Sequence, residues 1–248
     1  QSIMCAYYYF CFISPDFFAI HPVEYDSPEE DILLLDMSFR STVAEATMHV
    51  PAYADWIEKQ DQRPAYEYMK KMLKLLQWQR PAKRWVLKSP HHLEFLATCR
   101  EVFPDTKIIW PHRDPLKTMP SFFSMVAHSR YIFSDIVMAD EVAEHWGRKI
   151  AYMLERAMAY REQVDSNDFL DLKYQGIVDD GPGTVKAVYE KTGLKWTETV
   201  LREIKNQEAG HGQHRYGKHV YDITDFGMSE TRLSMLVDAY RKAYGFKV

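Results

Sequence analysis

Two short apolar runs, each followed at once by a turn and a helix-starting signal, constrain the fold of this chain most. Residues 84–88 (Arg-Trp-Val-Leu-Lys) end at Ser89-Pro90. Residues 107–110 (Lys-Ile-Ile-Trp) are followed by Asp114-Pro115, a typical N-cap and first helical residue. A helical segment separates the two runs. Strand, helix, strand and helix with short connections predict a βαβ unit and a parallel sheet.

The rest of the chain has mostly helical patterns. Ser27-Pro28 and the acids after it are typical of a helix start, and Pro64 predicts the start of another helix. Further predicted elements are a long amphipathic helix at 142–164, a third strand at 169–174, helices near 183–192, 198–207 and 229–243, and a loop from 210 to 222. We therefore predict a helix-rich α/β fold, a parallel β-sheet flanked by helices, as one domain over residues 1–248.

Composition excludes several classes of protein. The chain is 46% hydrophobic and 27% charged, as a globular protein is, and its net charge of −4 gives no indication of a nucleic-acid partner. The apolar run at residues 4–13 is too short for a membrane span, which needs about 20 residues. Three cysteines without metal-like spacing predict reduced thiols, a cytoplasmic location and no metal. A homo-oligomer stays open.

Cationic and polar side chains follow both predicted strands. Lys88 begins the run Lys-Ser-Pro-His91-His92, and Arg113 follows the second strand, with Ser121 eight residues later. Because ligands of open parallel sheets bind outside the carboxyl ends of the strands, we expect Lys88 and Arg113 to face one crevice. A guanidinium binds two phosphate oxygens at once, so this pattern predicts an anion site.

Each of these residues also has a plainer interpretation. A lone lysine at a strand end is most often solvated, and Arg113 beside Asp114 often forms a local ion pair that contributes little. His91 and His92, taken separately, are typical surface or capping residues. Pro120 predicts either a kink in the helix that carries Ser121 or the start of a separate helix. It is the joint arrangement at two neighbouring strand ends that favours ligand binding.

The runs WVLKSPHHLEFL and VFPDTKIIWPHRDPLKTMPSFFSM resemble the core of bacterial-type sulfotransferases of the P-loop-related superfamily. The spacing from Arg113 to Ser121 is the same as in that family's motif for the donor's 3′-phosphate. The likeness extends from about residue 28 to 244 and implies a P-loop-like sulfotransferase fold. It also implies transfer of a sulfuryl group from 3′-phosphoadenosine-5′-phosphosulfate (PAPS) to a hydroxyl, or less often an amine, of a small-molecule, glycan or lipid acceptor.

The resemblance assigns roles to particular residues. Lys88 would stabilise charge on the leaving phosphate, and His92, at the family's KSPxHL position, would take the acceptor's proton, with His91 as second choice. Arg113 and Ser121 would bind the 3′-phosphate. Arg215 or Tyr216, in the late loop, would close over the nucleotide. The product would be adenosine 3′,5′-bisphosphate, and no metal is implied.

One family feature is missing from the sequence. The family binds the 5′-phosphosulfate with a loop of the type G-x-x-R-[ST]-G-[ST]-[ST], whereas the first glycine here is Gly147. We therefore expect an N-terminally truncated piece of an active enzyme that binds the donor weakly, with an exposed sheet edge. Two alternatives remain: a non-catalytic nucleotide-binding protein on a sulfotransferase scaffold, and a P-loop-like kinase, for which neither a glycine-rich loop nor Mg²⁺ ligands are identified.

Overall fold

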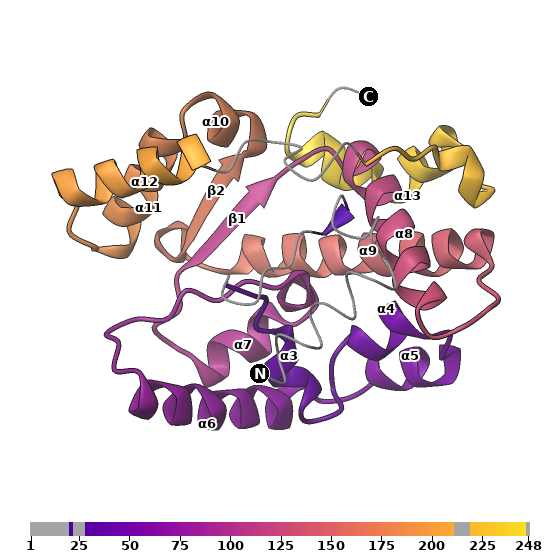
Figure 1. The fold of residues 1–248 in the computed structure, drawn as a ribbon, viewed down its shortest axis with the longest axis horizontal. Helices are drawn as coiled ribbons and strands as arrows, with labels where there is room; N and C mark the ends of the chain where they lie inside the picture. The colour runs from indigo at the N-terminus through magenta and orange to yellow at the C-terminus, as the bar shows by residue number, and fades with distance from the viewer. Residues whose placement is uncertain (1–19, 22–27, 211–218, 247–248) are drawn as a thin grey trace.

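The computed structural model describes residues 20–21, 28–210 and 219–246 (Figure 1). Its sheet consists of β1 (Ile108–His112) and β2 (Phe169–Lys173), which pair in parallel from Ile108 opposite Phe169 to His112 opposite Lys173. Two long helices, α8 (Pro115–Tyr131) and α9 (Ala139–Gln163), connect the strands. The predicted helix-rich α/β fold with a parallel sheet is confirmed.

The first predicted strand was wrong. Residues 84–89 have no regular secondary structure and pair with no strand among the described residues, and Val86 is 91% exposed. A strand needs a hydrogen-bonded neighbour, and an apolar run alone does not supply one. The helical part that follows is confirmed, but as two pieces, η1 (Pro90–Glu94) and α7 (Leu96–Val102). The parallel crossover therefore joins β1 to β2, and not residues 84–88 to β1.

The N-terminal helices begin in part where the sequence predicts. Pro64 lies in the first turn of α6 (Arg63–Gln79), as expected. The helix predicted from Ser27 instead begins later, as α3 (Ile32–Asp36) with Asp31 at its N-cap, and Pro28 precedes it without helical structure; Ser27 itself is outside the described residues. Two short helices follow, α4 (Val43–Thr47) and α5 (Pro51–Ile57).

The C-terminal third is helical after β2. Its elements are η2 (Ser166–Asp168) before the strand, and then α10 (Tyr174–Asp179), α11 (Gly181–Thr192), α12 (Glu198–Gly210), η3 (Ile223–Phe226) and α13 (Glu230–Ala243). The three helices predicted here are confirmed as α11, α12 and α13. The helix α11 ends at Gly193, whose positive φ of 68° is the left-handed cap that glycine adopts without steric cost.

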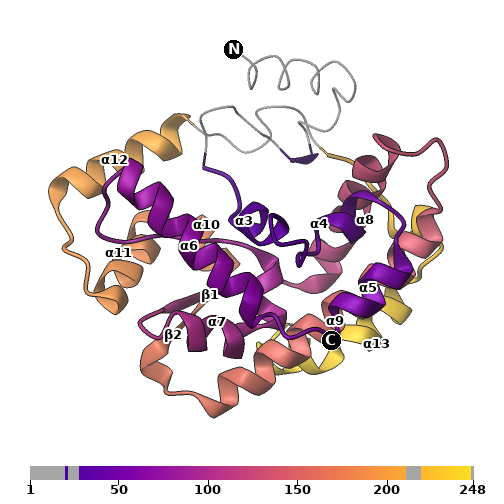
Figure 2. The ribbon, with the colours of Figure 1, turned by 90° about the horizontal axis from the view of Figure 1, so that it is seen from below.

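Two hydrophobic clusters form the core. The larger packs β1, β2, α8, α9 and α13 around Trp110, Phe123 and Trp146. The smaller packs α3, α6 and α7 around Tyr66 and Met69, on the side that faces the viewer in Figure 2. The stretch that follows residue 86 contributes to both clusters, so the turn after residues 84–88 lies where they meet.

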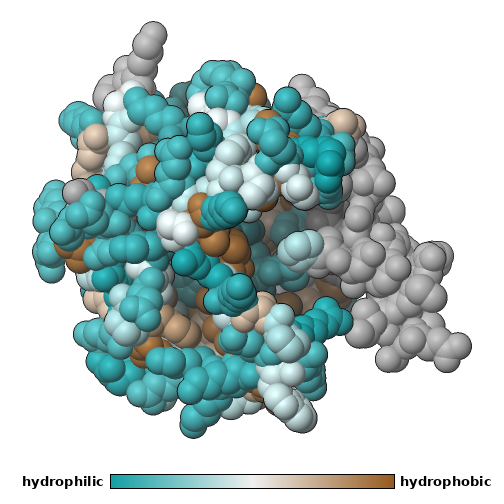
Figure 3. All heavy atoms as spheres, turned by 90° about the vertical axis from the view of Figure 1, so that its left-hand side faces the viewer, coloured by the Kyte–Doolittle hydropathy of each residue, from teal (hydrophilic) through white to brown (hydrophobic). Residues whose placement is uncertain are grey.

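One face of the molecule gives little indication of a large apolar interface. The face at the ends of α6, α11 and α12 is mostly hydrophilic, with small scattered hydrophobic spots (Figure 3). Within the described residues, no helix combines the length and the apolar character that crossing a bilayer requires.

Candidate functional site

Arg113 directly follows β1 and lies against an aromatic ring from the neighbouring strand end. Because His112 is paired with Lys173, the next residues of the two strands, Arg113 and Tyr174, are neighbours at the carboxyl edge of the sheet. The guanidinium carbon lies 4.3 Å from the centre of the Tyr174 ring, and Arg113 remains exposed. A cation at this distance over a ring face is held electrostatically but keeps its N–H groups available for another ligand.

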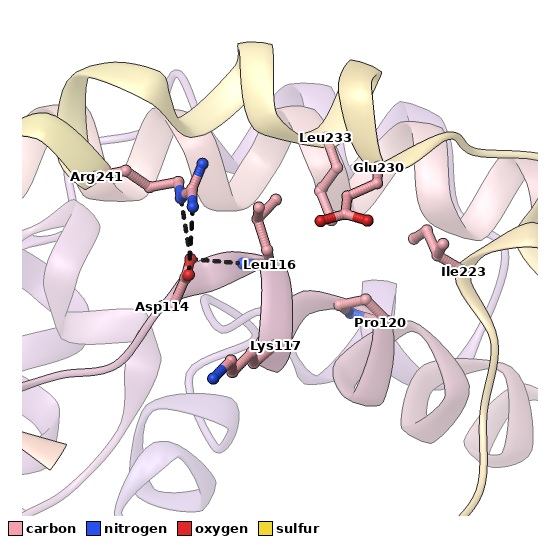
Figure 4. A pocket seen from close by; sticks show the side chains of 8 residues that line it. All are labelled: Asp114, Leu116, Lys117, Pro120, Ile223, Glu230, Leu233 and Arg241. Carbon is pink, nitrogen blue, oxygen red and sulfur yellow. Dashed lines mark hydrogen bonds and ion pairs between the residues drawn. The ribbon is translucent and has the colours of Figure 1, made fainter. Parts of the chain in front are cut away.

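Asp114 does not pair with its neighbour Arg113. Its carboxylate caps α8 by accepting from the backbone N–H of Leu116 at 3.1 Å, and it accepts from Nε of Arg241 on α13 at 3.1 Å. Asp114, Leu116 and Arg241 also line a cavity of about 250 Å³ beside α8 and α13 (Figure 4). The local ion pair considered for Arg113 is therefore replaced by a tertiary one that connects α8 with α13.

Ser121 lies in the second turn of α8 and is half-buried. The helix runs without interruption through Pro120, which is buried, so the separate helix considered at this position does not form.

Lys88 ends the extended segment and is largely exposed. Its Nζ forms an ion pair with the Glu30 carboxylate, and 72% of its side chain is accessible. Its carbonyl oxygen accepts from the backbone N–H of Asp31 at 3.3 Å. Ser89 then caps η1 by accepting from the His91 N–H at 3.2 Å. We call residues 88–92 the Lys88 turn.

Of the two histidines in the Lys88 turn, His92 has hydrogen-bond partners on both ring nitrogens and His91 is buried. His92 contacts the Tyr66 hydroxyl through Nδ1 and Oδ2 of Asp31 through Nε2, each at 2.8 Å. His91 is 1% exposed and packs on Phe95, with ring centres 4.9 Å apart. Burial holds the pKa of His91 well below its ordinary value. Neither imidazole offers an open nitrogen to a ligand in this conformation.

A buried charge cluster lies beneath the Lys88 turn. Lys149 of α9 is fully buried, and its Nζ lies 2.8 Å from Glu94, 3.3 Å from Glu58 and 3.8 Å from Glu45. Burial raises the pKa of Glu94, which outweighs the opposing attraction of Lys149. Nε of Arg156 donates to the Glu94 carbonyl at 2.9 Å. We call the lysine and its three carboxylates the Lys149 cluster; it attaches η1 to α9.

Comparison with known proteins places this arrangement in a family. A profile of the sulfotransferase family matches residues 8–198, more than half of the chain. The chain belongs to the sulfotransferase family. It is 24% identical over 162 residues to the omega-hydroxy-beta-dihydromenaquinone-9 sulfotransferase Stf3 of Mycobacterium bovis, and equally to that of Mycobacterium tuberculosis. The match covers 65% of this chain and 42% of each relative, so the chain spans less than half the length of these relatives.

Two solved sulfotransferase structures share the fold. STF9 from Mycobacterium avium has a TM-score of 0.82 at 24% identity, covering 91% of this chain and 58% of that one. STF1 from Mycobacterium tuberculosis has a TM-score of 0.77 at 28% identity, covering 92% and 62%. The resemblance drawn from the sequence motifs is confirmed at the level of family and fold.

The structure places most of the predicted site residues in two groups. Lys88, His91 and His92 share one turn, and Arg113 lies at the sheet edge before the helix that carries Ser121. No contact among the described residues joins Arg113 to Lys88, and their common crevice stays a prediction. The residues assigned to the late loop, Arg215 and Tyr216, are outside the described part of the chain. Within that part, no group of three or more His, Cys, Asp or Glu side chains has an arrangement suited to a metal ion.

Sequence reasoning missed three kinds of residue that shape the site. Tyr174 is the last residue of the third predicted strand, and that position at a strand end was an available signal. Glu30 and Asp31 resemble first-turn acids of a helix, so nothing in the sequence connected them with Lys88. Lys149 lies seven residues after Val142 and four before Met153, within the buried stripe of α9. A lysine in such a stripe is a signal for a buried partner.

Proposed function

We propose that this chain carries the part of a PAPS-dependent sulfotransferase that binds the donor's 3′-phosphate and stabilises its leaving group. The observation that carries the proposal is the state of Arg113: exposed at the carboxyl edge of the sheet, held over Tyr174, and not neutralised by Asp114. When bound, the donor supplies the sulfuryl group. The chain spans 42% of the length of its curated relatives, so the sulfotransferase activity itself is also part of this proposal.

Arg113 suits a phosphate because its planar fork donates to two oxygens at once. The Tyr174 ring restricts the guanidinium without using its N–H groups, which reduces the entropy lost on binding. The Ser121 hydroxyl, from the second turn of α8, would add a neutral donor. These residues fit a terminal phosphate. The glycine-rich loop that would surround a 5′-phosphosulfate has no counterpart before Gly147.

Lys88 suits the leaving-group role because its ammonium is exposed and its turn is fixed. The Glu30 carboxylate pairs with the ammonium and holds it near the turn. A cation placed where negative charge develops lowers the barrier to group transfer. His92 at the same turn stays a candidate for the family's base, although both its ring nitrogens have partners here.

The acceptor we propose is a hydroxyl-bearing small molecule. The relative's name describes a hydroxylated menaquinone, which supports a hydroxyl over an amine. A cytoplasmic location and a homo-oligomeric state stay predictions. The kinase alternative loses its support with the family assignment. The non-catalytic alternative keeps one observation in its favour, the absence of glycine before Gly147.

Calorimetric titration with adenosine 3′,5′-bisphosphate and with adenosine 5′-monophosphate tests the donor assignment. The two nucleotides differ only in the 3′-phosphate. We expect the bisphosphate to bind the intact chain more tightly, and Arg113→Ala to remove that advantage. A hydrogen bond to a charged group contributes about 1.5–3 kcal/mol, so the expected loss is roughly 10- to 150-fold in affinity.

Arg202→Ala is the matched control, because Arg202 is an exposed arginine on α12 that pairs only with its neighbour Glu203 among the described residues. It should leave both affinities unchanged. Equal binding of the two nucleotides by the wild-type chain would refute the 3′-phosphate site. Specific bisphosphate binding without transfer to any hydroxyl acceptor, even in the longest form of the protein, would favour the non-catalytic alternative.

A further inference from the structure

His92 is held by side chains from two separate helices. The Tyr66 hydroxyl on α6 contacts Nδ1, and the Asp31 carboxylate at the start of α3 contacts Nε2, both at 2.8 Å. Tyr66 is 0% exposed and Asp31 is 7% exposed, so water competes little with either contact. We call Asp31, His92 and Tyr66 the His92 clamp. It joins residues 26 and 61 positions apart in the sequence.

The Asp31 contact fixes one hydrogen-bonding role in the His92 clamp. An ionised carboxylate only accepts, so Nε2 carries the hydrogen and donates to Asp31. The Tyr66 hydroxyl donates to Nδ1 of a neutral ring or accepts from it in an imidazolium, since a phenol can do either. Burial raises the pKa of Tyr66 well above its ordinary value, so the phenol itself stays protonated. In both cases each ring nitrogen is engaged with a protein group.

The His92 clamp is connected directly to Lys88. The backbone N–H of Asp31 donates to the Lys88 carbonyl at 3.3 Å, and the adjacent Glu30 carboxylate pairs with the Lys88 ammonium. Lys88 has no strand partner among the described residues that would fix its backbone. The contacts to Glu30, Asp31 and Tyr66 therefore hold the turn and its lysine, and the Lys149 cluster attaches the adjoining η1 to α9.

We propose that His92, with Asp31 and Tyr66, is a positioning residue that sets the place of the Lys88 ammonium, and does not itself remove the acceptor's proton. The inference rests on the role given to Lys88 in the proposed function. It goes beyond that function by assigning work to Asp31 and Tyr66, and by directing the search for the proton acceptor to other groups. If His92 acted as a base, it would first have to break its contact with Asp31 or with Tyr66.

The experiment compares Asp31→Asn with Asp31→Ala. The asparagine side-chain oxygen still accepts from Nε2–H, whereas alanine leaves it without a partner. The readout is the rate at which acetic anhydride modifies Lys88, followed by mass spectrometry and normalised to Lys186. Lys186 is a partly exposed lysine on α11 that pairs with Glu190 and is not part of the His92 clamp. We expect the relative modification rate of Lys88 to rise about two- to fivefold in Asp31→Ala, which is the change in equilibrium that corresponds to loss of an exposed ion pair such as Lys88–Glu30. In Asp31→Asn the rate should stay at the wild-type value.

Tyr66→Phe provides a second route that keeps the packing and removes only the hydroxyl. It should change the Lys88 rate in the same direction as Asp31→Ala. All rates are taken where denaturant curves show more than about 99% folded protein, which a gap of roughly 3 kcal/mol ensures. An unchanged Lys88 rate in both Asp31→Ala and Tyr66→Phe, or an equal change in Asp31→Asn and Asp31→Ala, overturns the proposal.

Titration of the same variants with adenosine 3′,5′-bisphosphate separates this proposal from the function on which it rests. Weaker binding in Asp31→Ala, with recovery in Asp31→Asn, supports both. If the wild-type chain does not distinguish the bisphosphate from the monophosphate, the donor site fails, while the Lys88 rates still decide whether the clamp positions the lysine. If bisphosphate binding depends on Arg113 but the Lys88 modification rates are the same in the clamp variants as in the wild type, the donor site is supported and the positioning role of the clamp is refuted.

Discussion

The two turns that carry the candidate cations are built in different ways. The β1–α8 turn, residues 112–115, follows a paired strand, and Asp114 caps the next helix. The Lys88 turn follows an unpaired extended segment, and side chains from α3, α6 and α9 hold it. Backbone pairing places Arg113, whereas buried polar contacts place Lys88. The second arrangement depends on a few individual side chains, so single substitutions should affect it more.

Lys149→Met should give the largest effect of any substitution near the Lys88 turn. Methionine has a similar volume, but it leaves the Glu45, Glu58 and Glu94 carboxylates crowded together without their central cation. Breaking a buried ion pair by removing one partner costs about 3–5 kcal/mol. Urea denaturation should show this loss in the free energy of unfolding. Amide hydrogen exchange should rise first at η1 and less at β1.

Arg148→Met is the control for this prediction. Arg148 pairs with the same Glu58, at 2.8 Å, but 48% of its side chain is exposed. Exposed ion pairs contribute about 0–1 kcal/mol, so the loss should stay within that range. Equal destabilisation by both substitutions would show that the burial of Lys149 has no special energetic weight.

Much of the fold could be predicted from local sequence patterns. The Asp114-Pro115 helix start and the three C-terminal helices each depend on neighbours within a few residues, and the β1 and β2 runs pair with each other as the apolar pattern requires. The run at 84–88 has the same apolar pattern but no pairing partner, and that lack is not visible within the run itself. Strand formation is a property of a pair of segments, so a one-segment pattern fails there.

The candidate site could be predicted only in part, for a related reason. The motifs located Lys88 and Arg113, and the resemblance to sulfotransferases gave them roles. Nothing local indicated that His92 contacts Asp31, 61 residues away, or that Lys149 contacts Glu58, 91 residues away. Such partners are chosen by tertiary packing of polar groups. The spacing of residues in the sequence does not show which polar groups will pack together.

The pH dependence of stability should also differ between the two turns. His91 and His112 both have a lowered pKa, mainly through burial, and His91 more strongly because Asp171 partly offsets the effect at His112. A histidine kept neutral in the folded state binds fewer protons than in the unfolded state below pH about 6.5. The full stability is therefore present above that pH and is lost as pH falls, by at most about 1.4 kcal/mol per pH unit for each group.

His91→Leu should flatten the stability curve between pH 7 and pH 5 more than His112→Phe does. Urea midpoints measured across that range give the slopes. A wild-type slope that survives His91→Leu would mean that His91 is not held neutral by the fold.

The smallest predicted effect concerns the β1–α8 turn, which backbone pairing positions. Tyr174→Leu removes the ring beneath Arg113 and keeps the sheet pairing, so Arg113 should stay at the strand end but lose its restraint. A partly exposed cation–π contact contributes about 0.5–1 kcal/mol, which corresponds to roughly two- to fivefold weaker binding of adenosine 3′,5′-bisphosphate. Tyr152→Leu removes another arginine–tyrosine contact, between Arg156 and Tyr152 within α9, and should leave that affinity unchanged. A loss as large as that of Arg113→Ala would show instead that the ring contacts the nucleotide directly, and that backbone pairing alone does not position this arginine.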